Sequence, residues 1–199
     1  MALPNAGIYG RLSPRDDIIA RDHQENAHVA RMAIIYDRLK NWPFPEITQT
    51  YTWKDTSFYA LSVGMGSDPC AREQLKFIYE PWLQAMPTMA SVLANPGFWV
   101  RHPDTGIDWA NSLHGEQDIV LHRTLPPEGT IVGQMQVETL VDRGAGKGAI
   151  MTTRNDLRDR ATNDLIASVY ATAFMRTNGG VRRPSGAAVA APRSAFSNS

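Results

Sequence analysis

Four long segments in the second half of the sequence alternate apolar and polar residues with a period of two. They cover 113–122, 131–141, 149–157 and 165–174, and turn residues rich in Gly and Pro separate the first three. This alternation is typical of antiparallel strands with one buried face and one face in solvent. The strands are longer than the usual length of about five or six residues, so the sheet must twist and coil. A coiled sheet needs an apolar cover, and the segments upstream offer helices for it. We therefore expect an α+β fold with helices first and an antiparallel meander after them.

The segments before the meander predict three elements. Thr52, with Asp55 three residues later, predicts the start of a helix over 53–63, because hydroxyl and carboxylate together satisfy free amide groups. Phe58 and Leu61 would lie on one face of it. A short strand is predicted over 75–80 and a short helix over 86–94. Most aromatic residues of this region are expected in the core, namely Trp42, Phe44, Trp53, Phe58, Tyr59, Tyr79 and Trp82.

Charge and cysteine content exclude several classes of function. The 199 residues include 20 basic and 20 acidic side chains, and this balance argues against a nucleic-acid partner. Cys70 is the single cysteine, which excludes an internal disulfide, and there is no four-ligand Cys/His zinc pattern. No apolar run has the ~18–20 residues of a membrane span. We therefore expect no metal, no membrane association and a cytoplasmic protein.

Composition also divides the chain into three parts. Residues 1–31 are polar and lack the apolar stretch of a secretory signal, so they predict an extension that is helical or disordered. Residues 32–180 are expected to form the globular domain. Residues 181–199 are rich in Pro, Ala and Ser and predict a disordered tail.

The sequence resembles a known family, and the resemblance becomes recognisable at His114-Gly115-Glu116-Gln117. The run SLHGEQDIVLHRTLPPEGTIVGQMQVETLVDRGAGKGAIM is similar to the N-terminal half of hydratase 2, the MaoC-like (R)-specific enoyl-CoA hydratases, a half also present in peroxisomal multifunctional enzyme type 2. YTWKDTSFYALSVGMG, LKFIYE and PTMASVLA resemble the family's first helix, its following strand and the start of its central helix. The resemblance covers about 32–180.

This resemblance implies a single hot-dog fold, an antiparallel sheet curled around a helix. Family members join two such repeats and add water to a trans-2-enoyl-CoA, giving a (3R)-hydroxyacyl-CoA. Their catalytic Asp and His lie in the second repeat, in a motif containing Asp-x-Asn-Pro-Leu-His, which this sequence lacks. We therefore expect no catalytic residue here, coenzyme A only as part of an acyl-CoA substrate, and a second hot-dog repeat as partner. That repeat would come from a homo-oligomer or a separate subunit, and the gene product is expected to carry only the first repeat.

The resemblance assigns substrate binding to His114, Gly115, Glu116 and Gln117, a strand end that would line the acyl or pantetheine pocket or contact the second repeat. Gly115 would permit close approach of a backbone. The alternative is a buried polar network that holds strand register, with Glu116 paired to an arginine or an amide.

Other polar residues leave both functional and structural interpretations open. His114 with Glu116, and Asp118 with His122, would share a strand face as acid–base pairs, although a solvated face explains the same spacing. The run 143–148 predicts a hairpin turn rather than a phosphate loop. The arginines at 154, 158 and 160 suggest a solvated loop that could meet coenzyme A phosphates. The loop 101–106, with its flanking aromatic residues, could cover an acyl chain or simply pack on the surface.

These observations leave three candidate functions for the protein. The first is the substrate-binding repeat of an enoyl-CoA hydratase. The second is a catalytically silent acyl-CoA-binding or structural module. A thioesterase ranks last, because it needs a carboxylate on the central helix and 86–94 contains neither Asp nor Glu.

Overall fold

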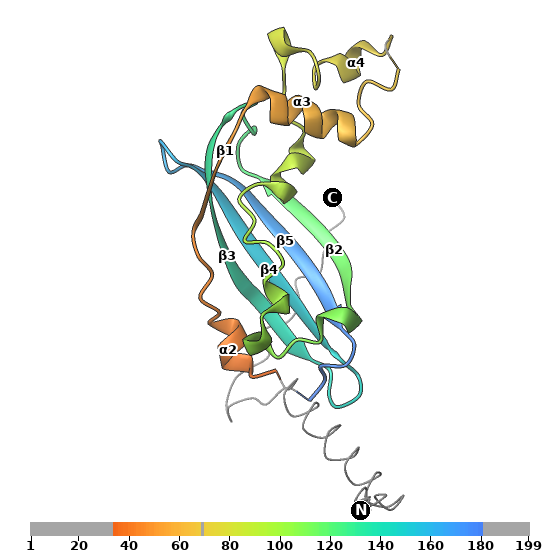
Figure 1. Cartoon of the computed structure of the whole chain (residues 1–199), viewed down its shortest axis with the longest axis vertical. Helices are drawn as coiled ribbons and strands as arrows, with labels where there is room; N and C mark the ends of the chain where they lie inside the picture. The colour runs from red at the N-terminus through yellow and green to blue at the C-terminus, as the bar shows by residue number, and fades with distance from the viewer. Residues whose placement is uncertain (1–33, 69, 181–199) are drawn as a thin grey trace, which may run out of the picture.

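The computed structural model describes residues 34–68 and 70–180. The predicted extension 1–31, the predicted tail 181–199 and the first two residues of the predicted domain lie outside these ranges. A five-stranded antiparallel sheet in the order β1-β3-β4-β5-β2 forms the body of the fold (Figure 1). Its strands are β1 (Ile47–Tyr51), β2 (Ser112–Leu121), β3 (Gly129–Asp142), β4 (Ala149–Asp159) and β5 (Leu165–Met175).

The four predicted strands are confirmed within a few residues at each end, and the run 143–148 is the hairpin turn between β3 and β4. Alternation is clearest in β4, where every second residue from Ala149 to Leu157 is buried. Strand β1 was not predicted from the sequence; it pairs antiparallel with the start of β3. With only five residues, β1 is too short to show a pattern against its neighbours.

Short helical turns cover the inner, buried face of the sheet. The 3-10 helix η2 (Pro87–Val92) lies against β2 and β5, where the sequence predicts a helix over 86–94. Three further turns follow: η3 (Trp99–Arg101), η4 (Pro103–Thr105) and η5 (Trp109–Asn111). They run in front of the sheet toward its lower end, so the sheet curls around this segment (Figure 1).

Two apolar clusters fill the space between this segment and the sheet. One includes Tyr51, Leu93, Leu157 and Ala167, near the hairpin that joins β4 to β5. The other includes residues at the opposite end of the sheet: Ile34, Leu39, Phe44, Ile107, Met151 and Met175. The short helix α2 (Tyr36–Lys40) belongs to this second end, and Lys40 Nζ donates hydrogen bonds to the carbonyls of Val137 and Glu138.

Ala94 holds the covering segment directly against the sheet. Its amide donates to Gln49 Oε1 over 2.7 Å, and its carbonyl accepts a 3.1 Å hydrogen bond from Asn155 Nδ2. A Cβ atom on Gly133 would lie 2.3 Å from that carbonyl oxygen. Three strands therefore fix the position of one residue, because β1 supplies Gln49, β3 supplies Gly133 and β4 supplies Asn155.

Helix α3 (Trp53–Ser62) confirms the predicted start. The Asp55 carboxylate accepts hydrogen bonds from the Thr52 amide and hydroxyl, and these bonds hold the pKa of Asp55 below its ordinary value. The predicted apolar face was wrong in direction. Phe58 and Leu61 are exposed, whereas the small side chains of Thr56 and Ala60 are buried.

The predicted strand over 75–80 was also wrong. This region holds the helix α4 (Arg72–Leu75), a helical turn closed by the hydrogen bond from the Tyr79 amide to the Leu75 carbonyl, and the 3-10 helix η1 (Glu80–Trp82). It projects beyond the sheet near α3 and is not among the five paired strands (Figure 1). Several aromatic residues predicted for the core are exposed for the same reason: Trp53, Phe58, Tyr79 and Trp82.

Candidate functional site

The predicted substrate-binding residues lie on β2, an edge strand of the sheet. His114, Gly115, Glu116 and Gln117 are all exposed, and Gln117 Nε2 donates a 2.8 Å hydrogen bond to the Tyr170 carbonyl. The Glu116 carboxylate forms neither an ion pair nor a hydrogen bond with any residue in the described ranges. The alternative of a buried network around Glu116 is therefore not what the fold contains. The role of these four residues in substrate binding stays a prediction.

A β-bulge at Gly115 decides which way these side chains face. His114 pairs with Ala173 and Glu116 pairs with Thr172, so the register shifts by one residue between them. Neighbouring residues of β5 point to opposite faces of the sheet. His114 therefore lies on the inner face and Glu116 on the outer face, and the prediction that they share a face was wrong. A Cβ atom on Gly115 would approach the Thr172 carbonyl oxygen to 3.3 Å.

The outer face carries a chain of polar contacts that crosses three strands and ends beyond β2. Arg154 on β4 forms ion pairs with Glu138 over 3.2 Å and with Asp156 over 3.3 Å. Ser168 on β5 donates a 2.7 Å hydrogen bond to Asp156 Oδ1, and its oxygen lies 3.1 Å from Nε2 of His122. Asp156 and Ser168 sit opposite each other in the sheet register.

The Ser168 hydroxyl decides where the protons lie in this series of polar contacts. Ser168 has one hydrogen and donates it to Asp156, so Nε2 of His122 must carry the hydrogen that it donates to Ser168. The Ser168 side chain is buried, with only 4% of the residue exposed, so its hydroxyl is not presented to a substrate. His114 and His122 have no direct hydrogen bond to a carboxylate within the described part of the chain. Asp156, Ser168 and His122 therefore form a clamp, a set of hydrogen bonds that connects neighbouring strands. They do not form an acid–base pair for hydration.

Predicted site residues elsewhere have structural contacts. Arg154 lies on a strand rather than in a solvated loop, and Arg160 pairs with Glu46 over 3.7 Å. The segment 98–109 is tied down, because Trp99 packs against Trp42 and Phe44, and Asp104 pairs with Arg38 over 2.8 Å. Cys70 is an exposed free thiol.

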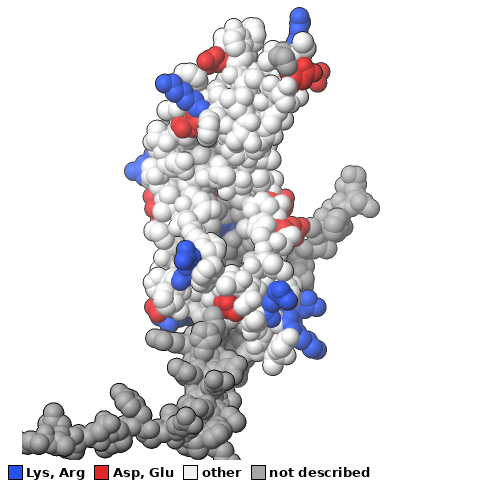
Figure 2. Space-filling view, turned by 45° about the vertical axis from the view of Figure 1, so that its right-hand side comes forward, with Lys and Arg blue, Asp and Glu red and all other residues white. Residues whose placement is uncertain are grey.

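Charged side chains and a hollow are unevenly distributed over the surface of the molecule. The face in Figure 2 is mostly free of charged side chains and is hollowed near its middle, whereas Lys and Arg gather at its lower end. Among residues 34–68 and 70–180, no group of three His, Cys, Asp or Glu side chains is placed to hold a metal ion. No described helix is long and apolar enough to cross a membrane.

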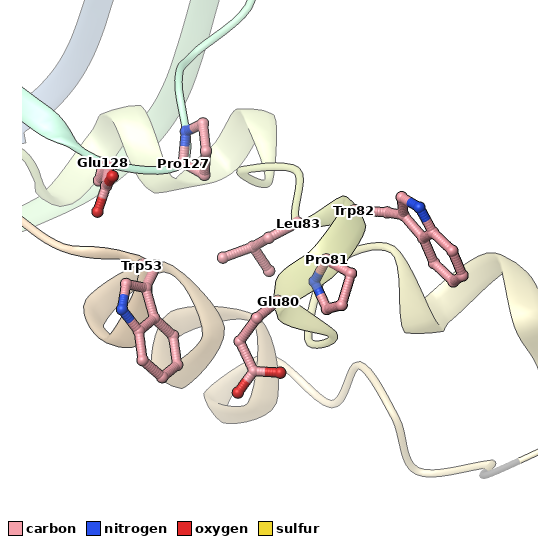
Figure 3. A pocket seen from close by; sticks show the side chains of 7 residues that line it. All are labelled: Trp53, Glu80, Pro81, Trp82, Leu83, Pro127 and Glu128. Carbon is pink, nitrogen blue, oxygen red and sulfur yellow. The ribbon is translucent and has the colours of Figure 1, made fainter.

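A pocket of about 440 Å³ lies at the upper end, between the start of α3, η1 and the β2–β3 connection. Figure 3 shows the Glu80 carboxylate below Leu83 and the Trp53 ring to the lower left of it, with Glu128 on the Trp53 side and Trp82 turned away. The apolar walls suit an apolar or flat group. The two carboxylates disfavour an anion such as a phosphate. This pocket could not be predicted from the sequence, because its residues come from three separate segments of the chain.

The fold places this chain among hot-dog proteins, in which a curled antiparallel sheet packs around a covering segment. A MaoC-like dehydratase from Phytophthora capsici superposes with a TM-score of 0.60 at 30% identity, covering 81% of this chain and 57% of that one. The peroxisomal multifunctional enzyme type 2 of Drosophila melanogaster has the same fold, with a TM-score of 0.53 at 22% identity over 93% of this chain and 31% of that one.

Sequence comparison identifies the family within this class. Residues 49–177 match the family described as the MFE-2 hydratase 2 N-terminal domain, and the chain belongs to that family. It is 30% identical over 151 residues to "Enoyl-CoA hydratase 2, peroxisomal" of Arabidopsis thaliana, covering 72% of this chain and 48% of the relative. It is 33% identical over 144 residues to "3-hydroxyacyl-thioester dehydratase Y" of Mycobacterium tuberculosis, covering 71% and 48%. The chain thus spans about half the length of these curated relatives.

Proposed function

We propose that this chain is the acyl-CoA-binding repeat of an enoyl-CoA hydratase, and that a second hot-dog repeat supplies the catalytic Asp and His. The reaction would add water to a trans-2-enoyl-CoA and give a (3R)-hydroxyacyl-CoA. Relatives named as enoyl-CoA hydratase and as hydroxyacyl-thioester dehydratase support this class of reaction. A cytoplasmic location belongs to the same proposal and can be checked by cell fractionation, since the Arabidopsis relative is named as peroxisomal.

The observation that carries the proposal is the state of β2. This ten-residue edge strand pairs only with β5, and eight of its ten positions are exposed. Leu113 and Val120 are among the exposed residues, at 53% and 41%. A long exposed edge with apolar side chains can pair with another strand. A second hot-dog repeat docked there would cover the edge and bring its catalytic pair close to His114–Gln117.

Reconstitution tests the proposal. The chain is assayed alone and with a separately expressed second-repeat hydratase domain, by the loss of enoyl-CoA absorbance. We expect turnover only in the mixture. Binding of acyl-CoA without turnover in the mixture would favour the silent binding module instead, and turnover by the chain alone would show that the catalytic pair lies within it.

A matched pair of variants tests the docking edge. Val120→Glu places a charge on β2, whereas Val63→Glu places it at the end of α3, at a valine that is similarly exposed at 45%. Helix α3 contacts β1, at the other edge of the sheet. We expect Val120→Glu to lower turnover of the mixture at least tenfold and Val63→Glu to leave it within twofold. Equal loss in both variants would contradict docking on β2.

A further inference from the structure

The pocket at the upper end of the molecule is lined by groups that favour a positively charged ligand. The Trp53 ring, which is 39% exposed, lines it together with the apolar side chains of Leu83 and Pro127. The carboxylates of Glu80 and Glu128 border the same space, and Figure 3 shows Glu128 on the Trp53 side and Glu80 below Leu83. An aromatic ring face carries negative potential, as a carboxylate does, so these groups all attract a cation.

The rest of the chain does not neutralise the two carboxylates. In the ranges 34–68 and 70–180, the side chains of Glu80 and Glu128 form neither an ion pair nor a hydrogen bond, and the ion pairs there join other residues. The Asp55 carboxylate on α3 differs, because it accepts two hydrogen bonds from Thr52. Two negative charges at the pocket are therefore left for a ligand.

One cation of the chain already lies against the Trp53 ring. The Lys54 ammonium is 5.5 Å from the centroid of that ring. Lys54 is exposed, is not part of the pocket wall, and forms no ion pair with any residue that the structure describes. The ring thus accepts an ammonium group as a neighbour, while Glu80 and Glu128 stay available.

Hydrogen bonds hold two walls of the pocket together before any ligand binds. The Thr56 hydroxyl on α3 donates to the Pro127 carbonyl over 2.6 Å. The Tyr51 hydroxyl, at the end of β1, donates to the Pro126 carbonyl over 2.7 Å. The β2–β3 connection is therefore fixed against the start of α3. A preformed pocket of this kind loses less conformational entropy when a ligand binds.

We propose that this pocket binds a small organic cation, an ammonium group carried on an apolar body. The apolar body contacts Trp53 and Leu83, and the ammonium group interacts with Glu80 and Glu128. The volume of about 440 Å³ is large enough for such a molecule. The ligand class differs from the acyl-CoA of the proposed function, so the two proposals stand or fall separately.

Three ligands that share a phenyl ring isolate the contribution of charge. Phenethylamine is a cation at pH 7, 2-phenylethanol is its neutral counterpart, and phenylacetate is an anion. Each is titrated into the ¹⁵N-labelled full chain, and the Trp53 indole signal, identified by its loss in Trp53→Leu, reports binding. We expect saturable binding of phenethylamine with a Kd on the order of 0.1–1 mM, because exposed ion pairs and cation–π contacts are each weak. The neutral ligand should bind at least fivefold more weakly, and the anion should not bind.

Glutamine variants test the two carboxylates. Glu80→Gln and Glu128→Gln should each weaken phenethylamine binding about two- to fivefold, and the double variant at least fivefold. Binding of 2-phenylethanol should stay within twofold in all of them. Glu73→Gln is the matched control, because Glu73 is an exposed carboxylate on α4 that does not line the pocket. It should change the affinity for phenethylamine by less than about 1.5-fold.

Several results would overturn the proposal. Equal binding of phenethylamine and 2-phenylethanol would make the pocket a plain apolar cavity, and tighter binding of phenylacetate would reverse the required charge. Equal loss in Glu73→Gln and Glu80→Gln would assign the effect to the general negative charge at this end of the molecule. Absence of a saturable shift of the Trp53 signal would exclude the site. Since none of these measurements uses turnover, failure of the hydratase reconstitution would leave the result for the cation unchanged.

Discussion

Replacing Gly133 by alanine should destabilise the protein strongly, because the covering segment lies directly on this glycine. The new Cβ would lie 2.3 Å from the Ala94 carbonyl oxygen and 2.8 Å from the Ala94 Cβ. Both atoms belong to a residue that Gln49 and Asn155 hold in place. No flexible side chain can move aside, so the segment must lift from the sheet.

The magnitude follows from the contacts that would be lost. Overpacking of a core costs about 1–3 kcal/mol. Each of the two hydrogen bonds to Ala94 contributes about 1 kcal/mol, and Asn155 would be left buried without its partner. We therefore expect Gly133→Ala to lower the free energy of unfolding by about 3–5 kcal/mol, a large part of the ~5–15 kcal/mol of a typical domain.

Gly129 offers a matched control on the same strand. A Cβ there would meet only Pro126 Cγ, at 3.9 Å, which is an ordinary contact. Gly129→Ala should therefore change stability by less than about 1 kcal/mol, because only the entropy of the unfolded chain differs. Urea unfolding followed by circular dichroism measures both variants, and hydrogen exchange of the Ala94 amide reports on local lifting. A Gly133→Ala variant as stable as Gly129→Ala, with the Ala94 amide still protected, would refute this reasoning.

Two further changes test buried polar groups. Burial raises the pKa of Tyr51 from 10.0 to about 12, so its stabilising contribution of about 2–3 kcal/mol is fully present below pH 10 and is lost as the pH rises to 12. The free energy of unfolding should therefore change less between pH 9 and pH 11 in Tyr51→Phe than in the parent protein. An equal change in both proteins would contradict this role of the Tyr51 hydroxyl. Ser168→Ala removes the bridge between Asp156 and His122 and should cost about 1–3 kcal/mol in urea unfolding. Ser91→Ala serves as the control, because the Ser91 hydroxyl donates only to the Thr88 carbonyl within its own turn. It should lower the free energy of unfolding by less than half as much as Ser168→Ala. An equal loss of stability in the two variants would argue against the bridge between Asp156 and His122.

The aromatic residues illustrate what a local pattern leaves undecided. The sequence predicts the same core position for the aromatic residues Trp42, Phe44 and Trp53. In the structure Phe44 is buried against Trp99, whereas Trp53 borders a pocket. The difference arises because the segment around Phe44 lies against the sheet, whereas α3 lies at its upper end, where less of the sheet remains to cover it. Exposure of Phe98 and Trp109 has a similar origin, since η5 lies where the sheet ends.

The long strands of the meander, the hairpin turn at 143–148 and the start of α3 at Thr52 could all be predicted from the sequence. Each depends on neighbouring residues, because the two-residue period and the capping contacts are properties of the local backbone. Three features could not be predicted in this way: the edge position of β2, the bulge at Gly115 that sends His114 and Glu116 to opposite faces, and the pairing of Ser168 with Asp156. These features depend on pairing register between segments far apart in the chain, and a shift of one residue reverses every face.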